Sequence, residues 1–193
     1  MIPAAGRRST ILNLDRLDVH LQVSNINNRR NQTTNDNNDS DTTIAATELV
    51  INRAFDAPRD LVYKAFTDPD QLAQWFGPVG FSVPRDTVDM DVRVGGHQRF
   101  VMVSDDNPDW QSPVDGYFTE VVQNELLVGT EEFQGMPGLQ PPTSMTMRLE
   151  FLDEPGGKTR LINTQGPYTN AAEPMARQGW ESSFAKLEPL LAR

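Results

Sequence analysis

Alternating apolar and polar positions dominate the chain from about residue 81 to residue 164 and predict β-strands there. A first strand is expected earlier, at residues 48–55 (ELVINRAF). The six later strands are DTVDMDV, HQRFVMV, VDGYFTEVV, NELLVGTEEF, TSMTMRLEF and KTRLINT. Because these six follow one another without an intervening helix, the pattern predicts an antiparallel meander, with a hairpin turn at Gly95–Gly96.

Two short helices are predicted directly behind the first strand. In residues 56–66 (DAPRDLVYKAF), Pro58 fits the first helical turn and apolar residues recur on one face. In residues 67–78 (TDPDQLAQWFGP), Asp68 is a natural N-cap, and Gly77 followed by proline ends the helix. Both segments therefore have the start and stop signals of short helices.

The second short helix ends on two large aromatic side chains, Trp75 and Phe76. Two destinations are open to them, the joint between the helices or the mouth of a cavity. We expect Phe76 in the joint, whereas the position of Trp75 stays open between the two.

A long helix is predicted at residues 173–191, where Trp180, Phe184, Leu187 and Leu191 recur every three or four residues. A single antiparallel sheet has to bury this apolar stripe against one of its faces. We therefore predict an α+β fold, in which a curved sheet of about seven strands wraps around a long C-terminal helix. A cavity is expected between the sheet and this helix.

Residues 1–47 differ from the rest of the chain in composition. They contain no aromatic residue, and residues 24–43 are almost entirely polar. Such a stretch cannot bury enough apolar surface to offset its chain entropy, so we expect a disordered tail at 1–47 and one domain at 48–193. An arginine pair near the start is not followed by an apolar segment, so we reject an export signal and expect a cytoplasmic protein.

Composition excludes several function classes. The net charge of −10 falls entirely on residues 48–193, and such a field would repel a phosphate backbone, so nucleic acid is not an expected partner. The chain has no cysteine and two histidines, which argues against disulfides, thiolate chemistry and a histidine-rich metal site. No apolar run reaches the ~20 residues of a membrane span. We expect no cofactor and no metal.

Five segments in a fixed order resemble a known family. They are FDAPRDLVYKAFTDPDQLAQWFGP, DVRVGG, GYFTEVVQNELLVGT, GKTRLINT and GWESSFAKLEPLL. They are similar to the START-like, birch-pollen-allergen-like superfamily (SRPBCC). More narrowly, they resemble the family named for homologues of the C-terminal domain of the activator of the ninety-kilodalton heat-shock protein ATPase. The resemblance covers residues 48–193 and implies the helix-grip fold.

The resemblance implies a hydrophobic pocket between the sheet and the C-terminal helix. Members of the superfamily bind lipids, hormones or polyketides there, and a few catalyse cyclisation or hydrolysis. At Gln98 this chain departs from the family, which often carries an aromatic residue there, so a polar group is expected in an apolar cavity. The predicted pocket-lining residues are Trp75, Gln98, Phe100, Met102, Met145, Met147, Trp180 and Phe184.

Three functions remain open on the sequence alone. The first is a binder of a hydrophobic, lipid-like or aromatic small molecule in this pocket. The second is a protein-interaction module of the co-chaperone or stress-response type, although residues 1–47 are too short and polar to be the chaperone-binding domain of the eukaryotic co-chaperone. The third is a cyclase or hydrolase, and no catalytic residue is assigned. Formation of a homodimer also stays open.

For the titratable residues of the predicted domain, a structural role is a simpler explanation than catalysis. His97 is the one histidine of the predicted domain, and alternation places it opposite Gln98, on the outer face. Asp115 and Glu120 lie in one predicted strand, where a solvated face is the simpler explanation of two carboxylates. Tyr117 is expected to pack in the sheet.

Overall fold

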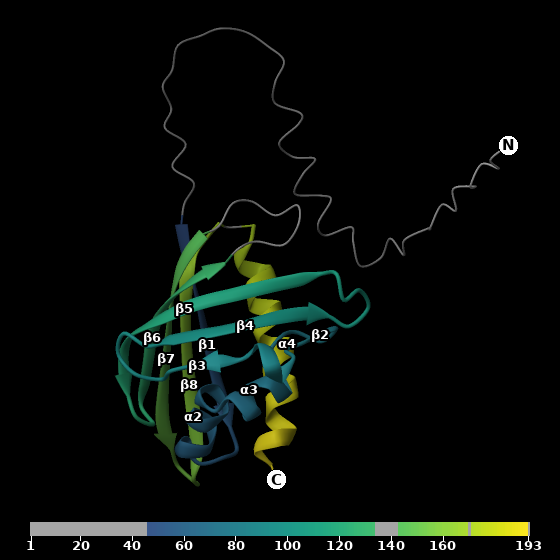
Figure 1. Ribbon diagram of the computed structural model, residues 1–193. Coiled ribbons are helices and arrows are strands. Elements are labelled where there is room, and N and C mark those ends of the chain that lie inside the picture. Colours follow the sequence, from purple (N-terminus) through teal and green to yellow (C-terminus); the bar gives the residue numbers. More distant parts are fainter. Residues whose placement is uncertain (1–45, 134–142, 170, 193) are drawn as a thin grey trace, which may run out of the picture. The chain divides into compact units, whose positions relative to one another are not determined.

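A computed structural model of the chain describes residues 46–133, 143–169 and 171–192 (Figure 1). These residues contain one sheet of eight antiparallel strands with the order β1-β8-β7-β6-β5-β4-β2, and β3 pairs with β4. The long strands are β1 (Ala46–Phe55), β4 (His97–Ser104), β5 (Gln111–Val122), β6 (Leu126–Phe133), β7 (Thr143–Glu154) and β8 (Lys158–Thr169). The strands β2 (Phe81–Ser82) and β3 (Asp89–Met90) have two residues each. The predicted meander is confirmed, and the first strand joins it by pairing with the last.

Three α-helices accompany the sheet in the described residues. The short helices α2 (Arg59–Thr67) and α3 (Pro69–Trp75) follow β1, and α4 (Glu173–Leu191) is the last element. Figure 1 shows α2 and α3 beside the C-terminal half of α4. The expected helix-grip fold is confirmed, and α4 spans the predicted residues.

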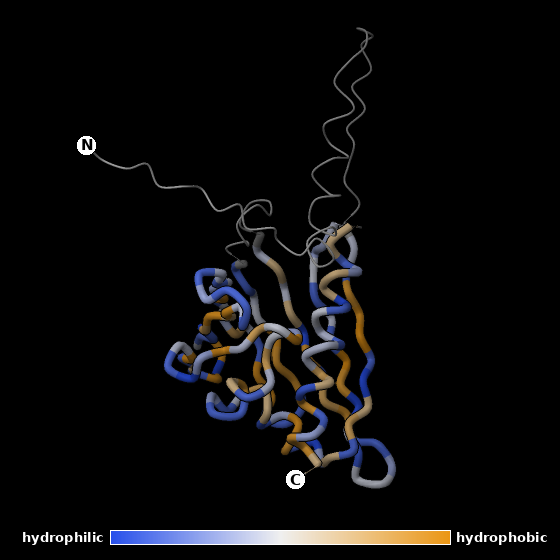
Figure 2. Tube along the Cα trace, turned by 90° about the vertical axis from the view of Figure 1, so that its right-hand side faces the viewer, coloured by the Kyte–Doolittle hydropathy of each residue, from blue (hydrophilic) through white to orange (hydrophobic). Residues whose placement is uncertain are grey.

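Strand periodicity decides which side chains face α4. Along β7, Met147, Leu149 and Phe151 are buried, while the residues between them are more exposed. Figure 2 shows that apolar colour lies mainly along the strands and hydrophilic colour mainly at the turns. The side of the sheet that carries these buried residues is its inner face.

Two glycines of the inner face, Gly116 and Gly129, lie in the middle of strands. A Cβ at either position would lie 2.8 Å from a backbone oxygen of the neighbouring strand, that of Thr130 or Tyr117. A glycine inside a strand marks a bend or a close approach. These two therefore permit tight curvature, and they leave the inner face without a side chain at two adjoining places.

The prediction of a strand at residues 86–92 is wrong except at its centre. Residues Arg85–Thr87 form a single 3₁₀ turn, in which the Thr87 hydroxyl donates to the Pro84 carbonyl at 2.8 Å. The same hydroxyl accepts a hydrogen bond from the Val101 backbone at 3.2 Å. A threonine that bonds locally in this way competes with regular strand pairing, so only Asp89–Met90 joins the sheet.

The remaining expectations concern the turn at Gly95–Gly96 and the N-terminal tail. The predicted turn at Gly95–Gly96 is present, although it closes a wider loop: Gly95 has a φ of 78°, and the Gly96 N–H bonds to the Arg93 carbonyl. The predicted tail lies outside the described residues apart from Ala46 and Thr47, where β1 begins.

Candidate functional site

The candidate site is the region between the inner face of the sheet and α4, which we call the sheet–helix space. Along the middle and C-terminal turns of α4 this space is filled, because Trp180, Phe184 and Leu187 are buried. Toward the N-terminal end of α4, Met175 and Ala176 are only half-buried. The buried stripe of α4 therefore runs from Trp180 to Leu187, and the side chains of its first turns are more exposed.

A chain of hydrogen bonds crosses the sheet–helix space. Both the Trp180 indole N–H and the Tyr168 hydroxyl donate to Oε1 of Gln165, at 2.8 and 2.6 Å. The Gln165 amide nitrogen in turn donates to Oε2 of Glu131 at 2.8 Å. One side chain of β8 thus links α4 to a carboxyl group of β6.

The surroundings of this network perturb two of its members. Burial raises the pKa of the Glu131 carboxyl from 4.5 to about 7, and the hydrogen bond from Gln165 opposes that rise. Burial, and then the negative charges of Glu131 and Glu173, raise the pKa of Tyr168. At neutral pH the tyrosine is a hydrogen-bond donor, and the carboxyl exchanges between its neutral and charged forms.

Two further amides of the inner face have no hydrogen-bond partner among the described residues. Gln98 is 7% exposed, and its side chain makes no hydrogen bond there. Asn163 is 0% exposed, and neither its amide nitrogen nor its amide oxygen is paired. A buried polar group without a partner costs about 1–3 kcal/mol. A molecule with a matching donor or acceptor would remove that cost.

The sheet register places Gln98, Gly116 and Glu131 in one row across three neighbouring strands. Gln98 of β4 pairs with Gly116 of β5, and Gly116 pairs with Glu131 of β6. Because neighbouring strands lie ~4.8 Å apart, the backbones of Gln98 and Glu131 are about 10 Å apart. The glycine between them is buried and has no side chain of its own, so no other side chain separates the two polar groups along this row.

Six of the seven apolar residues predicted to line the pocket lie on the inner face or on the helix stripe that faces it, and Trp75 is the exception. Phe100, Met147, Trp180 and Phe184 are buried there, and Met102 and Met145 are half-buried. The structure does not test whether they contact a ligand. That role remains a prediction, and the partial exposure of the two methionines fits it.

The structure decides the open position of Trp75 and corrects that of Phe76. Trp75 is 0% exposed, and its indole N–H donates to the Ala65 carbonyl at 2.9 Å, so it closes the joint between α2 and α3. Phe76 leaves the helix end and places its ring 4.7 Å from that of Phe100 and 5.6 Å from that of Trp180. Phe76 therefore reaches the sheet–helix space, and the expectation that it lies in the joint is wrong.

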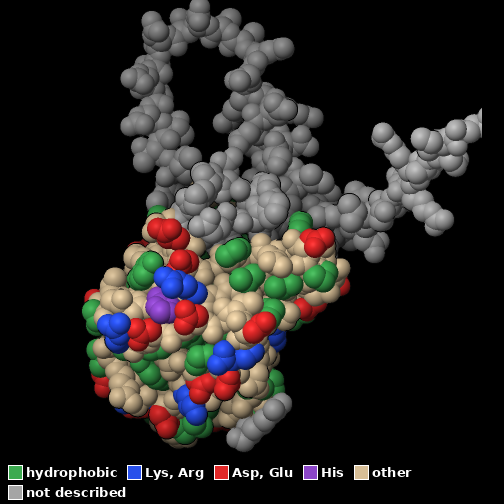
Figure 3. All heavy atoms as spheres, viewed as in Figure 1, with side chains coloured by type: hydrophobic (Ala, Val, Ile, Leu, Met, Phe, Trp, Pro, Cys, Tyr) green, Lys and Arg blue, Asp and Glu red, His purple; other side chains and the backbone are tan. Residues whose placement is uncertain are grey.

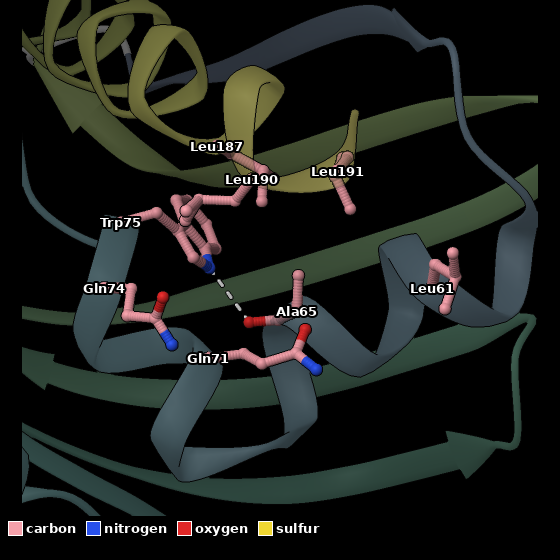
Figure 4. Close-up of a pocket in the computed structure, with 8 residues that line it drawn as sticks. All are labelled: Leu61, Ala65, Gln71, Gln74, Trp75, Leu187, Leu190 and Leu191. Carbon is pink, nitrogen blue, oxygen red and sulfur yellow. Dashed lines mark hydrogen bonds between the residues drawn. The ribbon is translucent and has the colours of Figure 1, made fainter. Parts of the chain in front are cut away.

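A separate hollow of about 270 Å³ lies where α2, α3 and the end of α4 meet (Figure 4). Its lining residues are Leu61, Ala65, Gln71, Gln74, Trp75, Leu187, Leu190 and Leu191. Ligand pockets for drug-sized molecules usually measure about 300–1,000 Å³. This helix-joint hollow falls just below that range, and no ionisable side chain lines it.

The outer face carries the remaining titratable candidates. The Arg99 guanidinium bonds to Asp115 at 2.9 Å and to the Tyr117 hydroxyl at 3.2 Å. His97 lies 2.9 Å from Asp89, on the outer face as predicted. Figure 3 shows the one histidine of the described residues among acidic and basic side chains. An enzyme that uses His97 inside the pocket therefore has no support, and Tyr117 is exposed rather than packed in the sheet.

The sequence interpretation missed Glu131, Asn163, Gln165 and Tyr168. One signal for two of them was available, because the alternation of β8 continues from buried Leu161 through Asn163 to Gln165. Nothing local indicated Glu131, since its contact with Gln165 spans 34 residues and depends on the register of β6, β7 and β8.

Two further features are absent from the described parts of the chain. No group of three or more acidic or histidine side chains there is arranged to hold a metal ion. No helix within residues 46–133, 143–169 and 171–192 is both long and apolar enough to cross a membrane.

Comparisons with known proteins agree with this architecture. Residues 56–192 match the family described as activator of Hsp90 ATPase homolog 1-like protein. Protein CV1439 from Chromobacterium violaceum is 26% identical, with a TM-score of 0.67 over 76% of this chain and 97% of its own. Protein NE0264 from Nitrosomonas europaea is also 26% identical, with a TM-score of 0.61 over 75% and 94%.

A third structure shows the fold alone. The AHSA1 protein from Silicibacter pomeroyi is 22% identical, with a TM-score of 0.62 over 76% of this chain and 98% of its own. No curated protein matches the chain.

Proposed function

Because the chain belongs to the family of activator of Hsp90 ATPase homolog 1-like proteins, we propose that it binds a hydrophobic small molecule in the sheet–helix space. The ligand has an apolar body that contacts the methionines and aromatic rings, and a polar group that pairs with an inner-face amide. Met102 and Met145 suit this role because an unbranched thioether side chain adapts to ligands of different shape.

The observation that carries this proposal is the pair of unpartnered amides on an apolar face. Gln98 and Asn163 are both more than nine-tenths buried, and neither has a hydrogen-bond partner in the described residues. Buried polar groups in folded proteins are usually paired. A side chain that remains unpaired inside a family fold that commonly binds hydrophobic ligands is therefore well placed to orient one.

A neutral apolar dye tests the proposal on the full chain. N-phenyl-1-naphthylamine should bind saturably at one site, with a rise in fluorescence. The substitution Met145→Trp adds bulk to the inner face and should weaken dye binding by about tenfold, which corresponds to ~1.4 kcal/mol. The neighbouring residue Thr146 points to the outer face and is exposed, so Thr146→Trp is the matched control and should leave binding unchanged.

Two results would contradict the proposal. One is the absence of saturable binding by the dye and by decan-1-ol, a flexible probe of different shape. The other is an equal loss of affinity in the two tryptophan variants, because that would place the dye away from the inner face. Urea unfolding of each variant establishes beforehand that both are folded.

A further inference from the structure

Glu131 is a carboxyl group on the inner face without a countercharge. One of its oxygens accepts the hydrogen bond from Gln165, a neutral amide. The ion pairs of the described residues join other groups, and none includes Glu131. A carboxylate held away from water without a cation is unfavourable. Its charged form would therefore be stabilised by a cation brought by a ligand.

The position of Glu131 gives such a cation a defined place. Gly116 places no side chain between Glu131 and Gln98, and the buried glycine lies against Glu131, whose Cγ is 3.4 Å from where a Cβ of residue 116 would be. The Gln98 amide offers a second acceptor oxygen that no described residue uses. Two acceptors on either side of a glycine suit a group with several N–H donors.

The negative charge of the whole domain also favours a cationic ligand. The net charge of −10 raises the local concentration of cations and lowers that of anions. Glu173, at the start of α4, adds a negative charge near Tyr168, and Arg177 is already bound to Glu173 at 2.6 Å. A ligand with a carboxylate would therefore meet repulsion at this end of the space.

Resting on the proposed function, we infer that the sheet–helix space binds an amphiphilic amine. Its ammonium group lies over Gly116 between Glu131 and Gln98, and its apolar body extends along Phe100, Met145 and the rings beside α4. A charge-assisted hydrogen bond from the ammonium to Glu131 is about twice as strong as a neutral one. An alcohol with the same apolar body makes only the neutral bond.

Three probes with the same ten-carbon chain separate these chemistries. Decylamine, decan-1-ol and decanoate are titrated against dye-loaded full chain at pH 8, and the dissociation constant of each is obtained from dye displacement. Decylamine should bind about tenfold more tightly than decan-1-ol, which corresponds to one charge-assisted bond in place of a neutral one. Decanoate should bind more weakly than either.

Two variants assign the preference to one carboxyl group. Glu131→Gln keeps the acceptor for Gln165 and removes the charge, so the preference for decylamine over decan-1-ol should vanish while the affinity for decan-1-ol is retained. The adjacent residue Glu132 is exposed on the outer face, and Glu132→Gln removes the same charge from the protein. This control should keep the preference, because only the inward carboxyl faces the ligand.

The pH gives an independent readout. Since the pKa of Glu131 is about 7 without ligand, protonation at pH 5.5 should weaken decylamine binding by about sevenfold relative to pH 8, because the neutral carboxyl still makes the neutral bond. The other titratable groups near Glu131 are Tyr168 of β8 and Glu173 of α4, and the facing positions Gly116 of β5 and Met145 of β7 do not titrate. Tyr168 stays neutral over this range, so the loss should be absent in Glu131→Gln.

The outcomes distinguish this inference from the proposed function. If decan-1-ol or decanoate binds as tightly as decylamine, or if Glu131→Gln retains the preference, the amine assignment is overturned and apolar binding stands. If none of the three probes displaces the dye and none binds directly in calorimetry, the amine assignment and ligand binding at this site are both overturned.

Discussion

The substitution Glu131→Gln should make the protein more stable at pH 8 and leave it unchanged in acid. The carboxyl has a pKa of about 7 in the folded protein and 4.5 as the ordinary value. The folded state therefore keeps a proton that the unfolded chain releases above pH 4.5. By linkage, the free energy of unfolding of the wild type falls as the pH rises from 4.5 to about 7.

The size of the effect follows from the two pKa values. At about 1.4 kcal/mol per pKa unit, the full difference corresponds to roughly 3 kcal/mol above pH 7. Glu131 is half-buried rather than fully enclosed, so water screens part of this penalty and we expect about 2 kcal/mol. For a domain of this size, that corresponds to a rise in melting temperature of roughly 4–8 °C.

Urea unfolding of both proteins between pH 4 and pH 8.5 measures the difference. Carboxyl groups common to the two proteins cancel, so the difference should be near zero at pH 4, grow from pH 4.5 to 7 and then level off. Glu132→Gln, on the outer face, should show no comparable rise. A stability difference between Glu131→Gln and wild type that does not change with pH would refute the argument that burial perturbs this carboxyl.

Three other substitutions test the structural account, each by urea unfolding. Trp75→Phe removes the hydrogen bond to the Ala65 carbonyl and should lower the free energy of unfolding by about 1–3 kcal/mol, while dye affinity is unchanged because Trp75 lies in the helix joint. Asp68→Ala removes the cap of α3, which accepts two backbone N–H groups, and should lower it by about 1 kcal/mol. Gly116→Ala places a Cβ 2.8 Å from the Thr130 carbonyl oxygen and should lower it by about 1–3 kcal/mol. An unchanged free energy of unfolding in any of the three variants would contradict the energetic role given to its contact.

Local chemistry explains why the helices could be predicted from the sequence. The N-cap at Asp68, the proline after it and Gly77 with a φ of 92° are punctuation that acts within a few residues. The stripe of Trp180, Phe184 and Leu187 likewise depends only on helical spacing. Such signals need no knowledge of the rest of the fold.

The contents of the candidate site could be predicted only in part. Gln98 and Phe100 were found because strand alternation and the resemblance pointed to the same face. The Glu131–Gln165–Trp180 network was not found, because it joins β6, β8 and α4 through a register that no local pattern specifies. The position of Trp75 stayed open and that of Phe76 was wrong for a related reason. Consecutive residues at a helix end point in very different directions, and composition alone does not say which one enters the core.

The central claim is that a ligand binds in the sheet–helix space, and the three tryptophans of the chain test it most directly. The Trp180 indole N–H lies in that space, that of Trp75 in the helix joint, and Trp110 at the turn between β4 and β5. In ¹H–¹⁵N spectra of the full chain titrated with decylamine, we predict a large shift of the Trp180 indole signal. The Trp110 signal should stay unmoved, and that of Trp75 nearly so. A shift confined to Trp75 would place the ligand in the helix-joint hollow, and saturable binding that leaves Trp180 unmoved would contradict the account.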